Sequence, residues 1–468
     1  MVEVNPHDTT SYGQTQEYEL QMKKASGDIR DLYAYYRFSD HQLTNIVLKE
    51  KVFKKQEVWF EGHMDWTFKE CSFRESFHFG VEGDRLDEDL RETAQNPEPF
   101  PPYGSNGLHF ELCSFKAPFE IRDNCNVIFK NCTFDSDVEE ITLGNGSRVE
   151  FIGCNFECAI TIEDYCDVKF RQCDFDETES HFVKATDNCK IYVDRCDVGN
   201  APQTSFFDLD NDCSLVLHNS GTLASEQADA IVAKNQSHVR AYNMEGIIAT
   251  TGVAITLEGG SKFEAHKVTT VSSSQGDAVV ATDSEFFARE GSTISSLQGK
   301  AMFLDGSVAR CASVDTITAG TGTCIDAVDS KIFIKGANTV SVGQGTCLLG
   351  DSSSFEFTDV VTISSGQGTC MSLSGIGRSY FRNISTVSSG SGTCLDISND
   401  HEIYFSNTTT ISSGSGIAVS LANSRFEDVG GTSVIGTLGG INATDSSVRL
   451  SVSGSLLGGD AGAGVMLV

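Results

Sequence analysis

One motif, aromatic-x-x-Cys-x-aromatic, recurs along the first half of the chain and restricts its fold more than any other feature. An earlier copy contains Cys71, and in the last copy valines replace the two aromatic residues. A repeat of roughly 20 residues is typical of solenoid proteins, in which each repeat packs only on its neighbours. The main cysteines follow one another at steps of 19, 22, 19 and 23 residues: Cys113, Cys132, Cys154, Cys173 and Cys196.

A second column of cysteines precedes the first by a fixed distance of seven residues. Within one repeat Cys125, Val127 and Phe129 have the same parity, so we expect them to face one side of a strand. Asn131 is then expected to turn the corner, and Ser147 to take the place of a cysteine in the next repeat. The second column consists of Cys125, Cys166, Cys189 and Cys213.

After about residue 222 the motif changes, but the period holds. Steps of 23, 23 and 24 residues separate four further cysteines, and counting on by such steps reaches alanines. We therefore expect a column of small buried side chains: Ala278, Ala301, Cys324, Cys347, Cys370, Cys394 and Ala418. A second, apolar column is predicted at Phe286, Ala309, Ile332, Phe355, Phe381 and Phe426. Repeated Thr-Ile/Val-Ser-Ser motifs predict a ladder of hydroxyl groups starting at Thr270, Thr293, Thr362, Thr386 and Thr410.

The period decides the fold class. Three short strands and their turns need 19–24 residues per coil, and alternation within each strand places one face inside. We therefore predict an all-β protein, a single long parallel β-helix of about 17 coils with a small, partly helical N-terminal cap. Helical and leucine-rich repeats are disfavoured, because leucine is not periodic and the abundant Gly, Ser, Thr and Val are poor helix formers.

The predicted organisation has three parts: an N-terminal cap or attachment segment (1–43), the β-helix (44–455) and an apolar C-terminal segment (456–468). Residues 81–107 interrupt the repeat and predict an inserted surface loop, and coils rich in Cys and Phe extend to about 222. Because an exposed apolar last coil invites aggregation, we expect a symmetric partner or another protein to bury the C-terminal end.

The net charge and the N-terminal residues restrict the classes of partner and the cellular location that we expect. The 34 basic and 65 acidic side chains give a net charge of −31, which opposes binding to nucleic acid or anionic lipid. The N-terminus lacks the basic start and apolar core of a signal peptide, and no apolar run approaches the ~18 residues of a membrane span. We therefore expect synthesis in a host cytoplasm, no membrane insertion and no nucleic-acid partner.

The cysteines are interpreted first as small buried core residues, with disulfides formed after assembly and metal ligation as alternatives. Cys154 and Cys158 alone have the spacing of a zinc-binding pair, and no companion pair accompanies them. The repeated Gly-x-Gly motif, as at Gly366 and Gly368, recurs from coil to coil before a strand. It is therefore interpreted as a turn, because a phosphate-binding loop occurs once and precedes a helix.

Carboxylates are the main enzymatic signal, because glycosidases need two of them about 5–10 Å apart. In a chain this acidic such pairs also arise by chance. Neither the histidines nor the tryptophans, Trp59 and Trp66, fall into a recognisable catalytic arrangement. The sequence therefore assigns no catalytic, cofactor-binding or metal-ligating residue, predicts no cofactor, and leaves enzymatic activity open. The candidate carboxylates are Glu139, Glu140, Asp174, Asp176, Asp208, Asp210 and Asp212.

The segments 127–134 (VIFKNCTF) and 168–175 (VKFRQCDF) resemble the right-handed, pectate-lyase-like β-helix superfamily. The resemblance covers most of the chain and implies a right-handed coil. That superfamily includes polysaccharide lyases and hydrolases as well as the trimeric tailspikes and baseplate proteins of bacteriophages. The non-repeating N-terminal segment and the irregular acidic loop are most similar to the phage group.

The resemblance and the repeat together predict a structural virion component, a phage tail, baseplate or surface spike protein that forms a rigid shaft for attachment. We expect a homo-oligomer, a trimer, that binds other virion proteins through its N-terminal region, with a host surface glycan as a candidate partner. Two alternatives stay open: a tailspike that degrades polysaccharide with surface carboxylates, and a cellular β-solenoid scaffold.

Overall fold

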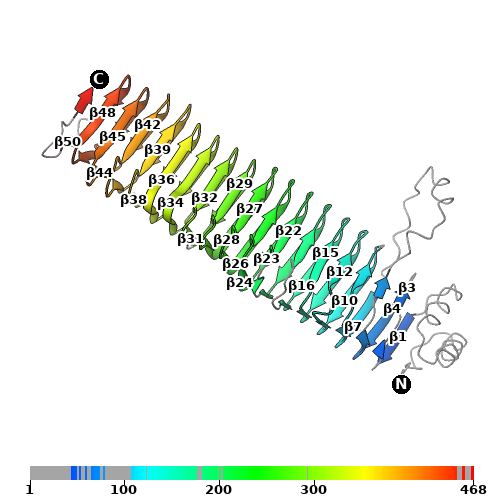
Figure 1. The fold of residues 1–468 in the computed structure, drawn as a ribbon. Coiled ribbons are helices and arrows are strands. Elements are labelled where there is room, and N and C mark those ends of the chain that lie inside the picture. The colour runs from blue at the N-terminus through cyan, green and yellow to red at the C-terminus, as the bar shows by residue number, and fades with distance from the viewer. Residues whose placement is uncertain are drawn as a thin grey trace, which may run out of the picture. The chain divides into compact units, whose positions relative to one another are not determined.

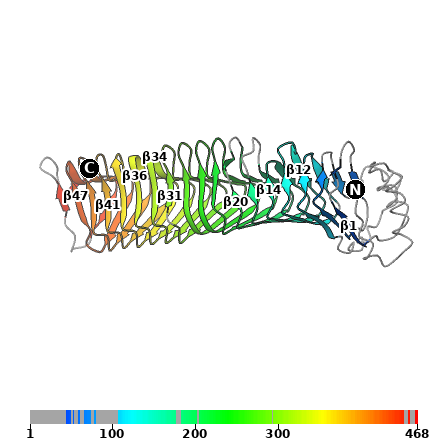
Figure 2. The same ribbon diagram turned by 90° about the horizontal axis from the view of Figure 1, so that it is seen from below.

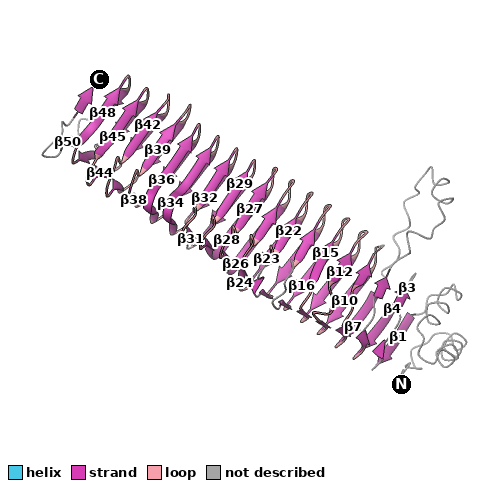
Figure 3. Cartoon of the chain, viewed as in Figure 1, coloured by secondary structure: helices cyan, strands magenta, loops and turns pink. Residues whose placement is uncertain are grey.

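The computed structural model describes residues 44–49, 52–53, 58–60, 65–73, 77–79, 107–450, 456–458 and 465–467, except for positions 123, 176–181, 199, 202–203 and 292. In this part every regular element is a strand, and the strands pair in parallel, which confirms the predicted all-β parallel β-helix (Figure 3). The predicted cap (1–43) and residues 81–106 of the predicted loop lie outside the described residues.

The chain forms two compact units. Unit 1 takes the described residues up to Ala201 together with Phe207–Val216, and unit 2 takes the described residues of 202–206 and of Leu217–Val468. Each unit is a stack of coils whose strands line up in columns (Figure 1).

Unit 1 has three strands in each coil. The first column is β1 (Thr44–Lys49), β4 (Asp65–Lys69), β7 (Gly107–Glu111), β10 (Asn126–Lys130), β13 (Arg148–Ile152), β16 (Asp167–Arg171) and β19 (Lys190–Asp194). The second is β2 (Val52–Phe53), β5 (Ser72–Phe73), β8 (Ser114–Phe115), β11 (Thr133–Phe134), β14 (Asn155–Phe156), β17 (Asp174–Phe175) and β20 (Asp197–Val198). The third is β3 (Val58–Phe60), β6 (Phe77–Phe79), β9 (Phe119–Ile121), β12 (Glu140–Leu143), β15 (Ala159–Ile162), β18 (Val183–Ala185) and β22 (Phe207–Leu209).

The aromatic residues of the motif form two stacks in the core of unit 1. One runs from Phe68 through Phe110 to Phe170, with ring centroids 4.8–5.1 Å apart. The other runs from Phe73 to Phe175 at 4.7–5.1 Å, and the two stacks meet edge to face. The spacing is that of paired strands, so the motif repeats because each ring must lie on its equivalent in the next coil.

The cysteine of each motif follows a sharp corner. Asn131 has a φ of +53°, as predicted for a corner residue, and Cys132 beyond it is 1% exposed. The Cys132 thiol donates a hydrogen bond to the carbonyl of Phe110 in the preceding coil, at 3.5 Å. Fifteen of the 16 cysteines are buried and Cys125 is partly exposed, which fits their interpretation as small core residues.

Unit 2 keeps the three columns, and its second-column strands are longer than those of unit 1. Figure 2 shows its stacked coils from another side. The first column is β26 (His238–Ala249), β28 (Lys262–Ser273), β30 (Glu285–Arg289), β33 (Val308–Ala312), β35 (Lys331–Lys335), β37 (Ser354–Thr358), β40 (Arg378–Arg382), β43 (Glu402–Ser406), β46 (Arg425–Val429) and β49 (Ser447–Arg449). The second contains the ends of β26 and β28, then β31 (Thr293–Ser296), β34 (Thr316–Val328), β36 (Thr339–Asp351), β38 (Thr362–Gln367), β41 (Thr386–Ser389), β44 (Thr410–Ser413), β47 (Ser433–Gly436) and β50 (Leu456–Gly458). The third contains β27 (Ile255–Glu258), β29 (Val279–Thr282), β32 (Met302–Asp305), the ends of β34 and β36, β39 (Met371–Ser374), β42 (Leu395–Ser398), β45 (Ile417–Ala422), β48 (Gly439–Thr444) and β51 (Val465–Leu467).

The predicted hydroxyl ladder is present in the second column of unit 2. Thr362, Thr386 and Thr410 are paired in register, and the ladder includes further threonines that the motif missed, Thr316 and Thr339. The buried serine that ends each motif donates a hydrogen bond to the turn of the preceding coil. Ser389, for example, donates a hydrogen bond to the carbonyl of Gly368 in the preceding coil, at 2.5 Å.

The Gly-x-Gly motif is a turn, as predicted, but in two coils it also continues the strands. It lies inside β34 and β36, where the residues of the turn pair between coils. Gly345 and Gly368 have φ values of +121° and +122°, and a Cβ atom at Gly368 would lie 2.4 Å from the carbonyl oxygen of Gly345. Glycine is therefore required at these positions by both conformation and space.

The predicted apolar column is wrong at Phe381. Phe355 lies level with Ser379, because the amide of Phe355 donates a hydrogen bond to the Ser379 hydroxyl at 3.2 Å, while Phe381 pairs with Phe357. The fully buried His401 binds Ser379 from the next coil, with 3.0 Å between its Nε2 and the hydroxyl oxygen. A polar pair thus fills the space where the pattern suggested an aromatic ring.

Candidate functional site

A hollow of about 250 Å³ lies on the outer face of unit 1, over strands β16 and β19. Val168 and Phe170 of β16 point into the core, so Lys169 and Arg171 between and beside them point outward. In the next coil Tyr192 pairs with Lys169, and Asp194 pairs with Arg171. The fold thus brings together side chains that are 23 residues apart in the sequence.

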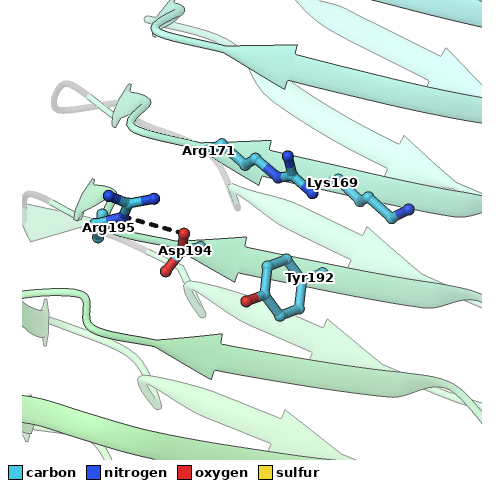
Figure 4. A pocket seen from close by; sticks show the side chains of 5 residues that line it. All are labelled: Lys169, Arg171, Tyr192, Asp194 and Arg195. Carbon is cyan, nitrogen blue, oxygen red and sulfur yellow. Dashed lines mark hydrogen bonds and ion pairs between the residues drawn. The ribbon is translucent and has the colours of Figure 1, made fainter.

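Three cations and one phenol ring line this hollow together with a single carboxylate (Figure 4). Arg195 joins it from the corner after β19, where its φ is +52°, and its Nε lies 3.1 Å from Oδ2 of Asp194. Nη1 of Arg171 lies 3.1 Å from Oε1 of Glu150 in the coil before. These ion pairs hold the two guanidinium groups in place while about half of each side chain stays exposed.

The hollow has the chemistry of a site for an anionic sugar. Guanidinium groups bind carboxylate or sulfate groups through paired hydrogen bonds, and an aromatic ring packs on the apolar face of a sugar ring. Asp194 is the one carboxylate among the five lining residues. Hydrolysis of a glycosidic bond ordinarily needs two carboxyl groups, so this arrangement fits binding better than cleavage.

The carboxylates that the sequence singled out lie elsewhere. Glu140 in β12 accepts a hydrogen bond from the Thr161 hydroxyl, Asp174 in β17 pairs with Asp197, and Asp208 in β22 pairs with Lys184. None of the candidate carboxylates lines the hollow, and Asp176 lies outside the described residues. Sequence reasoning missed Lys169, Arg171, Tyr192 and Arg195, although strand parity combined with the 23-residue step would have placed the first three on one outer face.

Unit 2 carries a second charged surface on the outward positions of its first strand column, which we call the basic face. Of the 13 lysines and arginines of unit 2, ten lie on this face, together with only five glutamates. The rest of unit 2 holds three basic and 18 acidic side chains. The ten are Arg240, Lys262, Arg289, Arg310, Lys331, Lys335, Arg378, Arg382, Arg425 and Arg449.

Aromatic side chains alternate with the cations of the basic face. The guanidinium of Arg310 lies between the rings of Phe287 and Phe333, 5.1 Å from each centroid. Further along, Tyr380 and Tyr404 stack with centroids 5.0 Å apart. Such pairs fix long flexible cations in one geometry, so the face is preorganised.

An acidic edge borders the basic face in unit 2. It follows the corner between the third column and the first, and six of its seven carboxylates are exposed. No lysine or arginine lies on this edge between its first and last members. The acidic edge consists of Glu258, Asp283, Asp305, Asp329, Asp351, Asp400 and Asp445.

The cysteines do not form a conventional metal centre. Among the described residues, no group of three or more His, Cys, Asp or Glu side chains is placed to hold a metal ion. Cys158 and Cys311 are 3% and 2% exposed, and burial raises the pKa of Cys311 to about 12 and that of Cys158 further. Cys154 is 1% exposed, and burial raises its pKa as well. Cys154 and Cys158 thus behave as apolar core residues, since a raised pKa keeps a thiol protonated and a poor ligand.

Comparison with known proteins supports the fold. Residues 56–235 match a family model described as the right handed beta helix region. Together with the parallel coils, this match supports the predicted superfamily and a right-handed β-helix. No curated protein and no solved structure matches the chain. Among the residues that the structure describes, none belongs to a helix that could cross a membrane.

Proposed function

We propose that this protein is a structural attachment component that binds an anionic surface glycan through the hollow of unit 1. The observation that carries the proposal is the grouping of Lys169, Arg171 and Arg195 around Tyr192 in a chain whose net charge is −31. A local group of basic side chains in an otherwise acidic protein favours an anionic ligand. The phenol ring can pack on the apolar face of a sugar ring. The stacked coils hold these groups on rigid strands.

The biological setting that we propose is a virion. A tail, baseplate or surface spike protein of a phage needs a stiff shaft between particle and host, and a right-handed β-helix provides one. In this proposal three copies associate, residues 1–43 bind other virion proteins, and the chain is made in the host cytoplasm. The non-repeating N-terminal segment and the apolar C-terminal segment of the sequence support it.

The test is the binding of the full chain to a carboxylated and a sulfated polysaccharide, with neutral dextran as the reference, by isothermal titration calorimetry. Tyr192→Ala should weaken binding by about tenfold or more, since a central aromatic contact is typically worth more than 1 kcal/mol. Tyr165→Ala is the matched control, because Tyr165 is 70% exposed and lies outside the hollow. Equal loss in both variants, or no binding by the native chain, would contradict the proposal.

A further inference from the structure

The charges of unit 2 are segregated in a way that suits contact between copies of this chain. The basic face holds ten basic and five acidic side chains, and the acidic edge holds seven carboxylates. Both surfaces run along the stack of coils, so both advance by about 4.8 Å per coil. Two parallel copies can therefore place opposite charges against each other in most coils, although β37 and β43 carry no lysine or arginine. An unrelated acidic protein would match this period only by chance.

We propose that the basic face of unit 2 receives the acidic edge of a second copy, with the two copies parallel. This inference rests on the proposed homo-oligomer and assigns its interface. Because the two surfaces are different parts of the chain, the contact is heterologous, and a heterologous contact that closes forms a ring. Three copies would thus share three identical contacts and leave the hollow of unit 1 outside the assigned surfaces.

Two copies can associate in this way although each carries a large negative net charge. At physiological ionic strength repulsion between exposed charges is screened beyond about 8 Å, so the charges that meet at the contact decide the outcome. Arg310, between two phenylalanine rings, is an arginine and aromatic cluster of the kind that interfaces favour. Exposed ion pairs contribute little individually, but complementary surfaces set orientation and partner.

The experiment measures the mass of the full chain by sedimentation velocity at low and high salt. The face variant is Arg289→Glu/Lys335→Glu, whose parent side chains are both exposed. The edge variant is Glu258→Lys/Asp305→Lys, at the ends of β27 and β32. Lys130→Glu/Lys184→Glu is the matched control, because both lysines are exposed and lie in unit 1, outside the basic face and the acidic edge. Circular dichroism checks that each variant is folded.

We expect a trimer that weakens as salt increases. The face and edge variants should each weaken association by roughly tenfold or more, the control should not, and combining the face and edge reversals should restore the trimer. A monomer at all salt concentrations, or a trimer indifferent to both reversals, overturns the proposal. A face variant that loses retention on a sulfated polysaccharide column but keeps its mass overturns it too, and assigns the face to a polyanion. Glycan binding at Tyr192 is measured separately, so failure of the interface is distinguished from failure of glycan binding. A monomer would refute the proposed homo-oligomer as well as this interface, whereas a trimer indifferent to both reversals would refute the interface alone.

Discussion

Replacing Phe151 with alanine should remove the centre of the aromatic core of unit 1. The ring is 0% exposed, and it stacks on Phe129 and Phe170 at centroid distances of 4.9 and 5.1 Å. It also meets Phe156 edge-on at 5.0 Å. Truncating a buried phenylalanine costs about 3–5 kcal/mol, and the cost is larger where the site cannot collapse. Strand pairing fixes the coils on both sides, so we expect a loss of about 5 kcal/mol in the free energy of unfolding.

The loss can be measured by urea unfolding followed by circular dichroism, with hydrogen exchange of the amides in β13 and β16 to locate it. Exchange is needed because a repeat protein can unfold in more than one step. Phe151→Leu is the matched control and should cost less than the alanine variant, since it keeps much of the side-chain volume. An alanine variant within about 1 kcal/mol of the native chain would refute the reasoning, because a centrally packed ring cannot be removed so cheaply.

Three further substitutions test the coils of unit 2. Gly368→Ala should lower stability by about 1–3 kcal/mol, because φ is +122° and the added Cβ would meet the carbonyl of Gly345; an unchanged melting temperature would contradict this. Cys347→Ala should cost no more than about 2 kcal/mol, since Ala301 fills the same column, whereas Cys347→Asp would bury a carboxylate. Equal losses on urea unfolding would refute that assignment. Burial lowers the pKa of His401 below its ordinary 6.5, so the unfolded chain takes up the proton first as pH falls. Stability should be full above about pH 6.5 and decline below it, and His401→Leu should flatten that decline in urea titrations at several pH values.

The core columns could be predicted because residue type records them directly. When an aromatic ring or a thiol recurs about every 20 residues, each repeat forms one coil, and equivalent side chains of neighbouring coils stack in the core. Phe129, Cys132 and Phe134 therefore lie where the motif placed them, and Asn131 turns the corner. The column of Ala278, the four cysteines and Ala418 is likewise buried throughout.

The prediction failed at positions whose residue type does not repeat from coil to coil. Phe381 was assigned to the wrong column because Ser379 and His401 satisfy each other in the core, and such a polar pair leaves no periodic trace. The hollow was missed because it joins Lys169 to Tyr192 across neighbouring coils. Charged residues on a solenoid surface ordinarily do not repeat, so the motif did not mark them; strand parity and the 23-residue step from Cys173 to Cys196 had to be combined, and the strand pairing confirms that register.

The chain length of an anionic polysaccharide, measured by size-exclusion chromatography before and after incubation with the full protein, tests the central claim of attachment without cleavage most directly. We expect the polysaccharide to bind and to be recovered at its original length, with binding reduced in Tyr192→Ala and retained in Tyr165→Ala. Shortened chains would contradict the account and identify a polysaccharide-degrading enzyme, as would binding that is indifferent to Tyr192.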